Sequence, residues 1–154
     1  MRIAQHAFGF NMPRRDLYVS PLHSVYVNGV MIPAIHLVND ITVTQSRRET
    51  IVTYYHVELS QHNAIYAEGL AAESYLDTTP ENRHFFKQND GERKVFALHP
   101  KFAACPETTP VWQHIWDTQG FAPLTQSGPI LEAVKAMLME RAQELVQQDK
   151  RLIA

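Results

Sequence analysis

The sequence of this 154-residue chain predicts a mainly β fold that continues into an irregular connector and a C-terminal α-helix. Three observations support this prediction: an Asn-Gly hairpin signal, a long stretch of alternating apolar and polar residues, and helical spacing near the C-terminus. The composition, 45% hydrophobic and 19% charged, is typical of a globular protein. We expect a β domain over residues 1–78, and a connector with a helical extension packed on it over residues 79–154.

The clearest hairpin signal lies within residues 24–33. Two apolar runs flank Asn28-Gly29, and this dipeptide supplies the two positive-φ residues of a type I′ turn. Short apolar runs at 17–19 and 41–44 predict two further strands.

A second β pattern covers residues 51–75. Apolar residues alternate with polar ones at Val57, Leu59, Ile65 and Ala67. A polar run at 60–63 interrupts the alternation, and Glu-Gly at 68–69 predicts a turn in which glycine adopts positive φ. Two histidines, His56 and His62, fall within this stretch.

Helical features appear only near the C-terminus. Three prolines between residues 100 and 110 disfavour regular structure, and residues 112–120 predict a short helix. Ser127-Gly128-Pro129 then predicts the start of a longer helix, because proline suits the first helical position. Its expected inner face has mostly 3/4 spacing and comprises Ile130, Val134, Met137, Leu138, Arg141, Leu145 and Val146.

Composition excludes several function classes. A net charge of −2 does not favour nucleic acid as a partner. The single cysteine, Cys105, excludes an internal disulfide. No paired His or Cys spacing typical of a metal site occurs, so no metal and no cofactor are expected. The chain has no apolar run of bilayer-spanning length and no signal-peptide core, so as given it is expected to be soluble and cytoplasmic, with a secreted parent protein left open.

The stretch 51–75 resembles the C-terminal conserved block of the Hint superfamily, the self-processing domains of inteins and hedgehog proteins. Tyr55–Leu59 resembles the first part of that block and His62–Ile65 the His-Asn-aromatic part. Glu73-Ser74 stands where inteins have a terminal His-Asn. The chain is most similar to a bacterial Hint-like subgroup with a comparable Trp-containing tail, so the resemblance covers nearly the whole chain and implies a Hint-type β body.

The resemblance implies four candidate catalytic residues. Ser20 and His23 resemble the family's Thr-x-x-His motif, in which the histidine protonates the leaving amide nitrogen. His62 resembles the histidine that assists the later cleavage step. His56 occupies the position where many inteins have an aspartate, so it is expected to orient a neighbour rather than to act as a carboxylate.

Departures from the family pattern limit the implied activity. The family nucleophile, a cysteine or serine in a Cys-Phe-x-x-Gly block, has no counterpart here; Met1 is no nucleophile, and Cys105 is far from the family position. Glu73 and Ser74 replace the His-Asn pair, which excludes cleavage by asparagine cyclisation. We therefore expect an incomplete Hint body that is inactive alone. Its partner would be its own precursor polypeptide or a missing N-terminal Hint portion.

Other readings of the same residues remain open. Isolated histidines are more often structural than catalytic, which is the expectation for His6, His36, His84, His99 and His114. A Ser-His hydrolase is disfavoured because no G-x-S-x-G elbow occurs. The alternative function is a non-catalytic interaction module that pairs through exposed strand edges and forms a homodimer. No nucleic-acid or membrane partner is expected.

Overall fold

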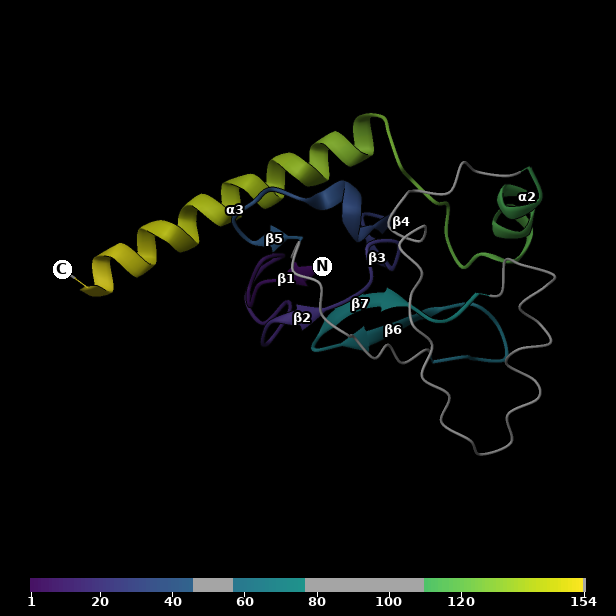
Figure 1. The fold of residues 1–154 in the computed structure, drawn as a ribbon, viewed down its shortest axis with the longest axis horizontal. Helices are drawn as coiled ribbons and strands as arrows, with labels where there is room; N and C mark the ends of the chain where they lie inside the picture. Colours follow the sequence, from purple (N-terminus) through teal and green to yellow (C-terminus); the bar gives the residue numbers. More distant parts are fainter. Residues whose placement is uncertain (46–56, 77–109, 154) are drawn as a thin grey trace.

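The computed structural model describes residues 1–45, 57–76 and 110–153 (Figure 1). These residues form two antiparallel β-sheets, a 3₁₀-helix and two α-helices. The elements are β1 (Arg2–Ile3), β2 (Leu17–Tyr18), β3 (Ser24–Val27), β4 (Val30–Pro33), η1 (Ala34–Leu37), β5 (Val43–Thr44), β6 (Ala64–Ala67), β7 (Leu70–Glu73), α2 (Pro110–Gln119) and α3 (Pro129–Ile153). The predicted mainly β fold with a C-terminal helix is confirmed.

The smaller sheet has three short strands in the order β2-β1-β5. Ile3 of β1 pairs with Leu17 on one side and Val43 on the other, and both Ile3 and Val43 are fully buried. Asn39 shortens the strand expected at 41–44, because its side-chain oxygen accepts the backbone N–H groups of Ile41, Thr42 and Val43. This Asx turn leaves only the last two residues to pair as β5.

The larger sheet joins two hairpins in the order β4-β3-β7-β6. Both hairpins close with type I′ turns, since Asn28 and Gly29 have φ of 51° and 82°, and Glu68 and Gly69 have φ of 53° and 85°. Both turns were predicted correctly. Pairing of Val25 in β3 with Ala72 in β7 joins the two hairpins into one sheet, and this pairing positions the candidate site.

The segment just before β6 differs from the expected strand. Val57 and Leu59 are 48% and 41% exposed, and between 57 and 63 the structure has only an isolated bridge from Glu58 to Tyr75. The polar residues at 60–63 turn the chain before β6 begins. Within the part of the chain that the structure describes, Val57 and Leu59 therefore have no sheet face to pack against.

The long helix α3 lies along the β body, beside η1 and β5, and its C-terminal half extends beyond the sheets (Figure 1). It begins at Pro129, as predicted. The side chains that it buries are Leu131, Val134, Leu138 and Ala142. The first three join the hydrophobic core of the strands. Two members of the expected inner face, Ile130 and Val146, are exposed, whereas Val134 and Leu138 are buried as expected. Leu131 and Ala142 complete the buried face, so it differs from the expectation only at its borders.

The connector from α2 to α3 runs along the outer edge of β4. Met31 donates its N–H to the carbonyl of Pro123 at 2.9 Å and accepts from the N–H of Thr125 at 2.8 Å. This pairing covers the β4 edge of the larger sheet. In the ranges that the structure describes, no helix is both long and apolar enough to cross a membrane.

Candidate functional site

The candidate site surrounds the carboxyl end of β7, at Glu73 and Ser74. Strand β7 lies between β3 and β6. The residue before β3 is His23, and the turn before β6 contains His62. The order of the strands therefore brings two histidines, 39 positions apart in the sequence, to the two flanks of the same pair of residues.

His23 lies beside the carboxyl group of Glu73. The distance from His23 Nδ1 to Glu73 Oε1 is 3.8 Å, and the Glu73 side chain is only 16% exposed. Burial raises the pKa of Glu73 to about 7, although hydrogen bonds from the backbone and hydroxyl of Ser24 favour its ionised form. Glu73 can therefore gain or lose a proton near neutral pH, beside the imidazole of His23.

Ser20 acts on His23 through the backbone. The carbonyl of Ser20 accepts the N–H of His23 at 3.2 Å, and the carbonyl of His23 accepts the N–H of Ala34 at 3.0 Å. The turn from Ser20 to His23 is thereby tied to the start of η1. This arrangement fixes the backbone of His23 just before it enters β3.

His62 is held in a different way. Its Nδ1 accepts the backbone N–H of Phe121 at 2.9 Å, and its ring meets the edge of Trp116 with centroids 5.1 Å apart and planes at 73°. A backbone N–H can only donate, so Nδ1 carries no hydrogen and the ring proton of the neutral form lies on Nε2. That assignment follows from the hydrogen bond.

Burial also keeps His62 neutral. It lowers the pKa of the imidazole, and the nearby backbone of Ser74 opposes this shift. Nε2 is buried and makes no hydrogen bond of normal geometry with any described residue. A buried donor without an acceptor is costly and uncommon in a native protein. Among the described residues, the backbone of Ser74 offers an acceptor nearby, although not at normal hydrogen-bond geometry.

Ser74 is fixed by Asn63, the residue before β6. Its Oγ accepts the N–H of Asn63 at 2.9 Å, and its own N–H donates to the carbonyl of Asn63 at 2.8 Å. Ser74 is 1% exposed. Its hydroxyl is thus held by a hydrogen bond from Asn63 at the ends of β7 and β6.

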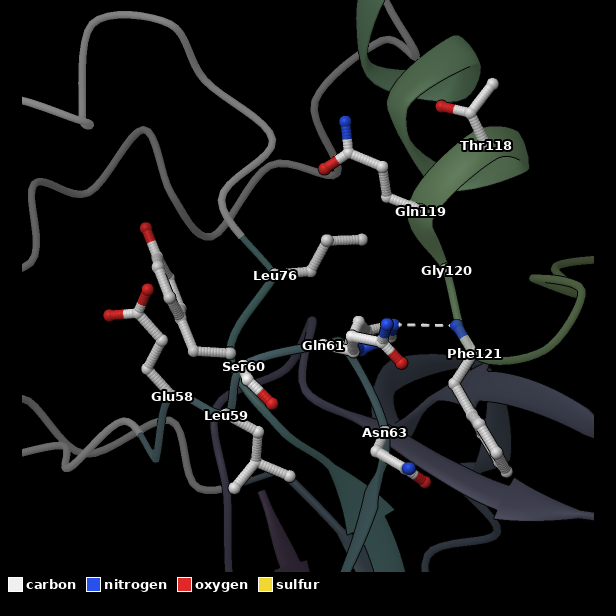
Figure 2. Close-up of a pocket in the computed structure, with 12 residues that line it drawn as sticks. Glu58, Leu59, Ser60, Gln61, Asn63, Leu76, Thr118, Gln119, Gly120 and Phe121 are labelled. Atoms are coloured by element: carbon white, nitrogen blue, oxygen red, sulfur yellow. Dashed lines mark hydrogen bonds between the residues drawn. The ribbon is translucent and has the colours of Figure 1, made fainter.

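A cavity of about 600 Å³ opens beside His62, between the turn at 58–63 and the end of α2 (Figure 2). Polar side chains dominate its wall: Glu58, Ser60, Gln61, Asn63, Thr118 and Gln119. His62 belongs to this wall and His23 does not. The two histidines thus approach Glu73 and Ser74 from different sides, and only the His62 side opens into this cavity.

Comparison with known families identifies the β body that carries these residues. A family model described as Hint domain matches residues 1–79. The chain belongs to the Hint domain family. No curated protein matches the chain, and no solved structure does either. His23, Glu73 and His62 all lie inside the range that defines the Hint domain here, whereas Trp116 and Phe121 lie outside it.

The structure brings together some of the four predicted site residues but does not describe all of them. It brings His23 to Glu73 and ties Ser20 to His23, and it places His62 against the backbone of Ser74. His56 lies outside the described residues. Catalytic roles for all four stay predictions. The described residues contain no group of three or more His, Cys, Asp or Glu side chains arranged to hold a metal ion.

Sequence reasoning missed two contributions to the site. Glu73 stood out only as a departure from the family pattern, although a carboxyl group at that position is itself a signal for proton transfer. Phe121 gave no signal at all, because its contribution is a backbone N–H. Any residue type except proline supplies that group, so only the structure can reveal it.

Proposed function

We propose that this chain supplies the acid–base groups of a Hint-type self-processing centre at the carboxyl end of β7. The observation that carries the proposal is the contact of His23 with the buried carboxyl of Glu73, 3.8 Å apart, within the Hint-matched residues. A carboxyl group that titrates near neutral pH beside an imidazole suits a reaction in which a peptide nitrogen must be protonated as it leaves.

The reaction has a defined balance of bonds and protons. A thiol or hydroxyl attacks the carbonyl carbon of a peptide bond, a carbon–sulfur or carbon–oxygen bond forms, and the carbon–nitrogen bond breaks. The nucleophile gives up one proton and the leaving nitrogen takes one. His23 and Glu73 can accept the first and supply the second, because the pKa of Glu73 is about 7.

The nucleophile comes from outside the described residues. Two hydroxyls adjoin the pair, those of Ser24 and Ser74, and each of these residues is 1% exposed. Ser24 is hydrogen-bonded to Glu73 and Ser74 to Asn63, and Cys105 lies outside the described residues. We therefore propose that the chain alone does not cleave. Its own precursor polypeptide, or a separate N-terminal Hint portion, would deliver the thiol or hydroxyl.

His62 and His56 have supporting roles in this proposal. The Nδ1 of His62 is occupied by the N–H of Phe121, so His62 acts through Nε2–H, as a hydrogen-bond donor to a carbonyl near Ser74 rather than as a base. His56 orients a neighbouring group by hydrogen bonding, as its position in the family pattern implies.

Complementation tests the proposed function. The chain is mixed with a cysteine-bearing Hint front that is fused to a reporter, a thiol is added, and intact mass spectrometry detects release of the reporter. Release is expected with the wild-type chain and is expected to fall with Glu73→Gln and His23→Ala. The control is Glu132→Gln, a helix carboxyl that is 66% exposed. A folded complex that releases nothing would overturn the proposal.

A second function, pairing between copies of the chain, is favoured by the β6 edge. Within the described residues β6 ends the larger sheet, and its Tyr66 is 84% exposed. Exposed strand edges recruit further strands. We propose a homodimer through β6 as the alternative. Light scattering after size exclusion decides, since a strict monomer at high concentration would exclude it.

A further inference from the structure

Three residues beyond the Hint-matched range surround the ring of His62. Phe121 donates its backbone N–H to Nδ1, and Trp116 meets the ring edge-on. Gly120 links the two, because its N–H donates to the carbonyl of Trp116 at 2.8 Å at the end of α2. The groups that fix His62 therefore come from a segment about 55 residues further along the chain.

Gly120 is required for this arrangement. A Cβ atom there would lie 2.5 Å from the carbonyl oxygen and 2.9 Å from Nε1 of Trp116. The same Nε1 donates to the carbonyl of Ala122 at 3.0 Å. The chain thus folds back over Trp116 directly after α2, and that fold aims the N–H of Phe121 at His62 (Figure 2).

The segment is also fixed to the larger sheet. The ring of Phe121 contacts Tyr26 of β3 edge-on, with centroids 5.2 Å apart. Met31 of β4 then holds Pro123 and Thr125 by backbone hydrogen bonds. The N–H of Phe121 is therefore held in place by contacts with both β3 and β4. It does not need to become ordered when a group binds at the site.

We propose that Trp116, Gly120 and Phe121 are positioning residues for His62, which hold its imidazole in the Nε2–H tautomer. The assignment of tautomer depends only on the geometry. Its consequence for self-processing rests on the proposed function, in which Nε2–H donates to a carbonyl near Ser74. Protonation of the ring would place a hydrogen on Nδ1 and break the hydrogen bond that Nδ1 accepts from Phe121. The three positioning residues therefore also oppose the charged form of His62.

Titratable groups near His62 come from both sides of the cavity. Glu58 and Tyr75 lie on its wall with His62, and His114 and Asp117 belong to α2 on either side of Trp116. The shift in the pKa of His62 has burial as its main cause and no charged partner. A change in tautomer after alteration of Phe121 therefore reports the lost N–H rather than an altered charge.

The test separates the N–H of Phe121 from its side chain by comparing two variants that both lose the aromatic ring. Phe121→Pro deletes the donor, and Phe121→Leu keeps it while changing the side chain. The measurement is the ¹⁵N spectrum of protein with labelled histidine. The His62 signals are assigned as those that disappear in His62→Gln. Wild type and Phe121→Leu should show a protonated Nε2 and an unprotonated Nδ1 for His62. Phe121→Pro should show mixed tautomers and a higher pKa of His62, because the donor that favours its neutral form is lost. Equal spectra for Phe121→Pro and Phe121→Leu would overturn the proposal.

A second variant covers the case in which Phe121→Pro does not fold. Gly120→Ala should also produce mixed tautomers, because its Cβ displaces Trp116 and shifts the N–H of Phe121. His114→Ala, on the exposed side of α2, should leave the His62 signals unchanged. If the His62 signals of Gly120→Ala matched those of His114→Ala, the proposed positioning of His62 would be contradicted. These spectra need no cleavage, so failure of the proposed function and failure of this inference can be told apart.

Discussion

The two parts of the described chain, residues 1–76 and 110–153, contribute to the site in different ways. The first part supplies three titratable side chains, those of His23, Glu73 and His62. The second supplies a backbone N–H, an indole ring and a buried helix face. His23 faces a carboxyl group, whereas His62 accepts a hydrogen bond from a backbone amide, so the two histidines that flank β7 have different surroundings.

This difference shows that the Hint-matched range is not the whole structural unit. The match ends at residue 79, yet Leu131, Val134 and Leu138 of α3 belong to the same core as the strands. The β body completes its core and fixes one of its histidines only with the later helices. The predicted boundary at residue 78 stays a prediction, and the following substitutions probe how independent the two parts are.

Truncation of Leu138 should have the largest effect. Its side chain is fully buried between α3 and the β body, so Leu138→Ala should lower the free energy of unfolding by about 2–5 kcal/mol. Val146→Ala, at a position 38% exposed on the same helix, should cost about 0.5 kcal/mol or less. Urea unfolding measures both. Equal small effects would show that α3 does not stabilise the β body.

Glu73→Gln should change how stability depends on pH. The folded state binds the Glu73 proton more tightly than the unfolded chain does, since the pKa rises from 4.5 to about 7. Stability of the wild type therefore falls as pH rises from 4.5 to 7, by on the order of 3 kcal/mol in total. The glutamine variant lacks this fall and should be the more stable protein above pH 7.

Unfolding curves measured at several pH values test the Glu73 prediction. Glu132→Gln, whose side chain is 66% exposed, serves as the control and should keep the wild-type profile. If Glu73→Gln and Glu132→Gln gave the same profile, Glu73 would not be the group responsible.

Substitution of the two hairpin glycines by alanine should lower the free energy of unfolding by different amounts, although their turns are alike. Gly29 and Gly69 both have positive φ, 82° and 85°, so alanine at either should cost about 1–2 kcal/mol in backbone strain. A Cβ on Gly29 meets open space, whereas one on Gly69 lies 2.8 Å from the carbonyl oxygen of Asn11. Gly69→Ala should therefore be the more destabilising of the two. Matched thermal unfolding checks this, and equal costs would contradict the packed geometry around Gly69.

His62 should make the smallest contribution to the pH dependence of stability, and its sign is opposite to that of Glu73. Its pKa is lowered in the folded state, so the unfolded chain binds that proton more readily and stability rises as pH rises towards 6.5. Because Glu73 opposes this trend, we compare Glu73→Gln with the double variant Glu73→Gln/His62→Gln. The rise with pH should weaken in the double variant, and an unchanged slope would count against a buried neutral His62.

Local features of the sequence were sufficient for much of the fold. Asn28-Gly29 and Glu68-Gly69 fix their turns by backbone preference alone, and Pro129 fixes the start of α3. The strand expected around Val57 and Leu59 was wrong, because an alternating pattern needs a sheet face to cover it, and the described residues provide none for 57–59.

The sequence by itself determined the hairpin turns and the start of the terminal helix, since these depend on neighbouring residues, and it contains two histidines in motifs that resemble those of the Hint family. Only the tertiary structure decided that Glu73 is a buried partner of His23, and that the N–H of Phe121 sets the tautomer of His62. Burial and backbone hydrogen bonds between distant segments depend on how the chain packs, and no side-chain pattern encodes them.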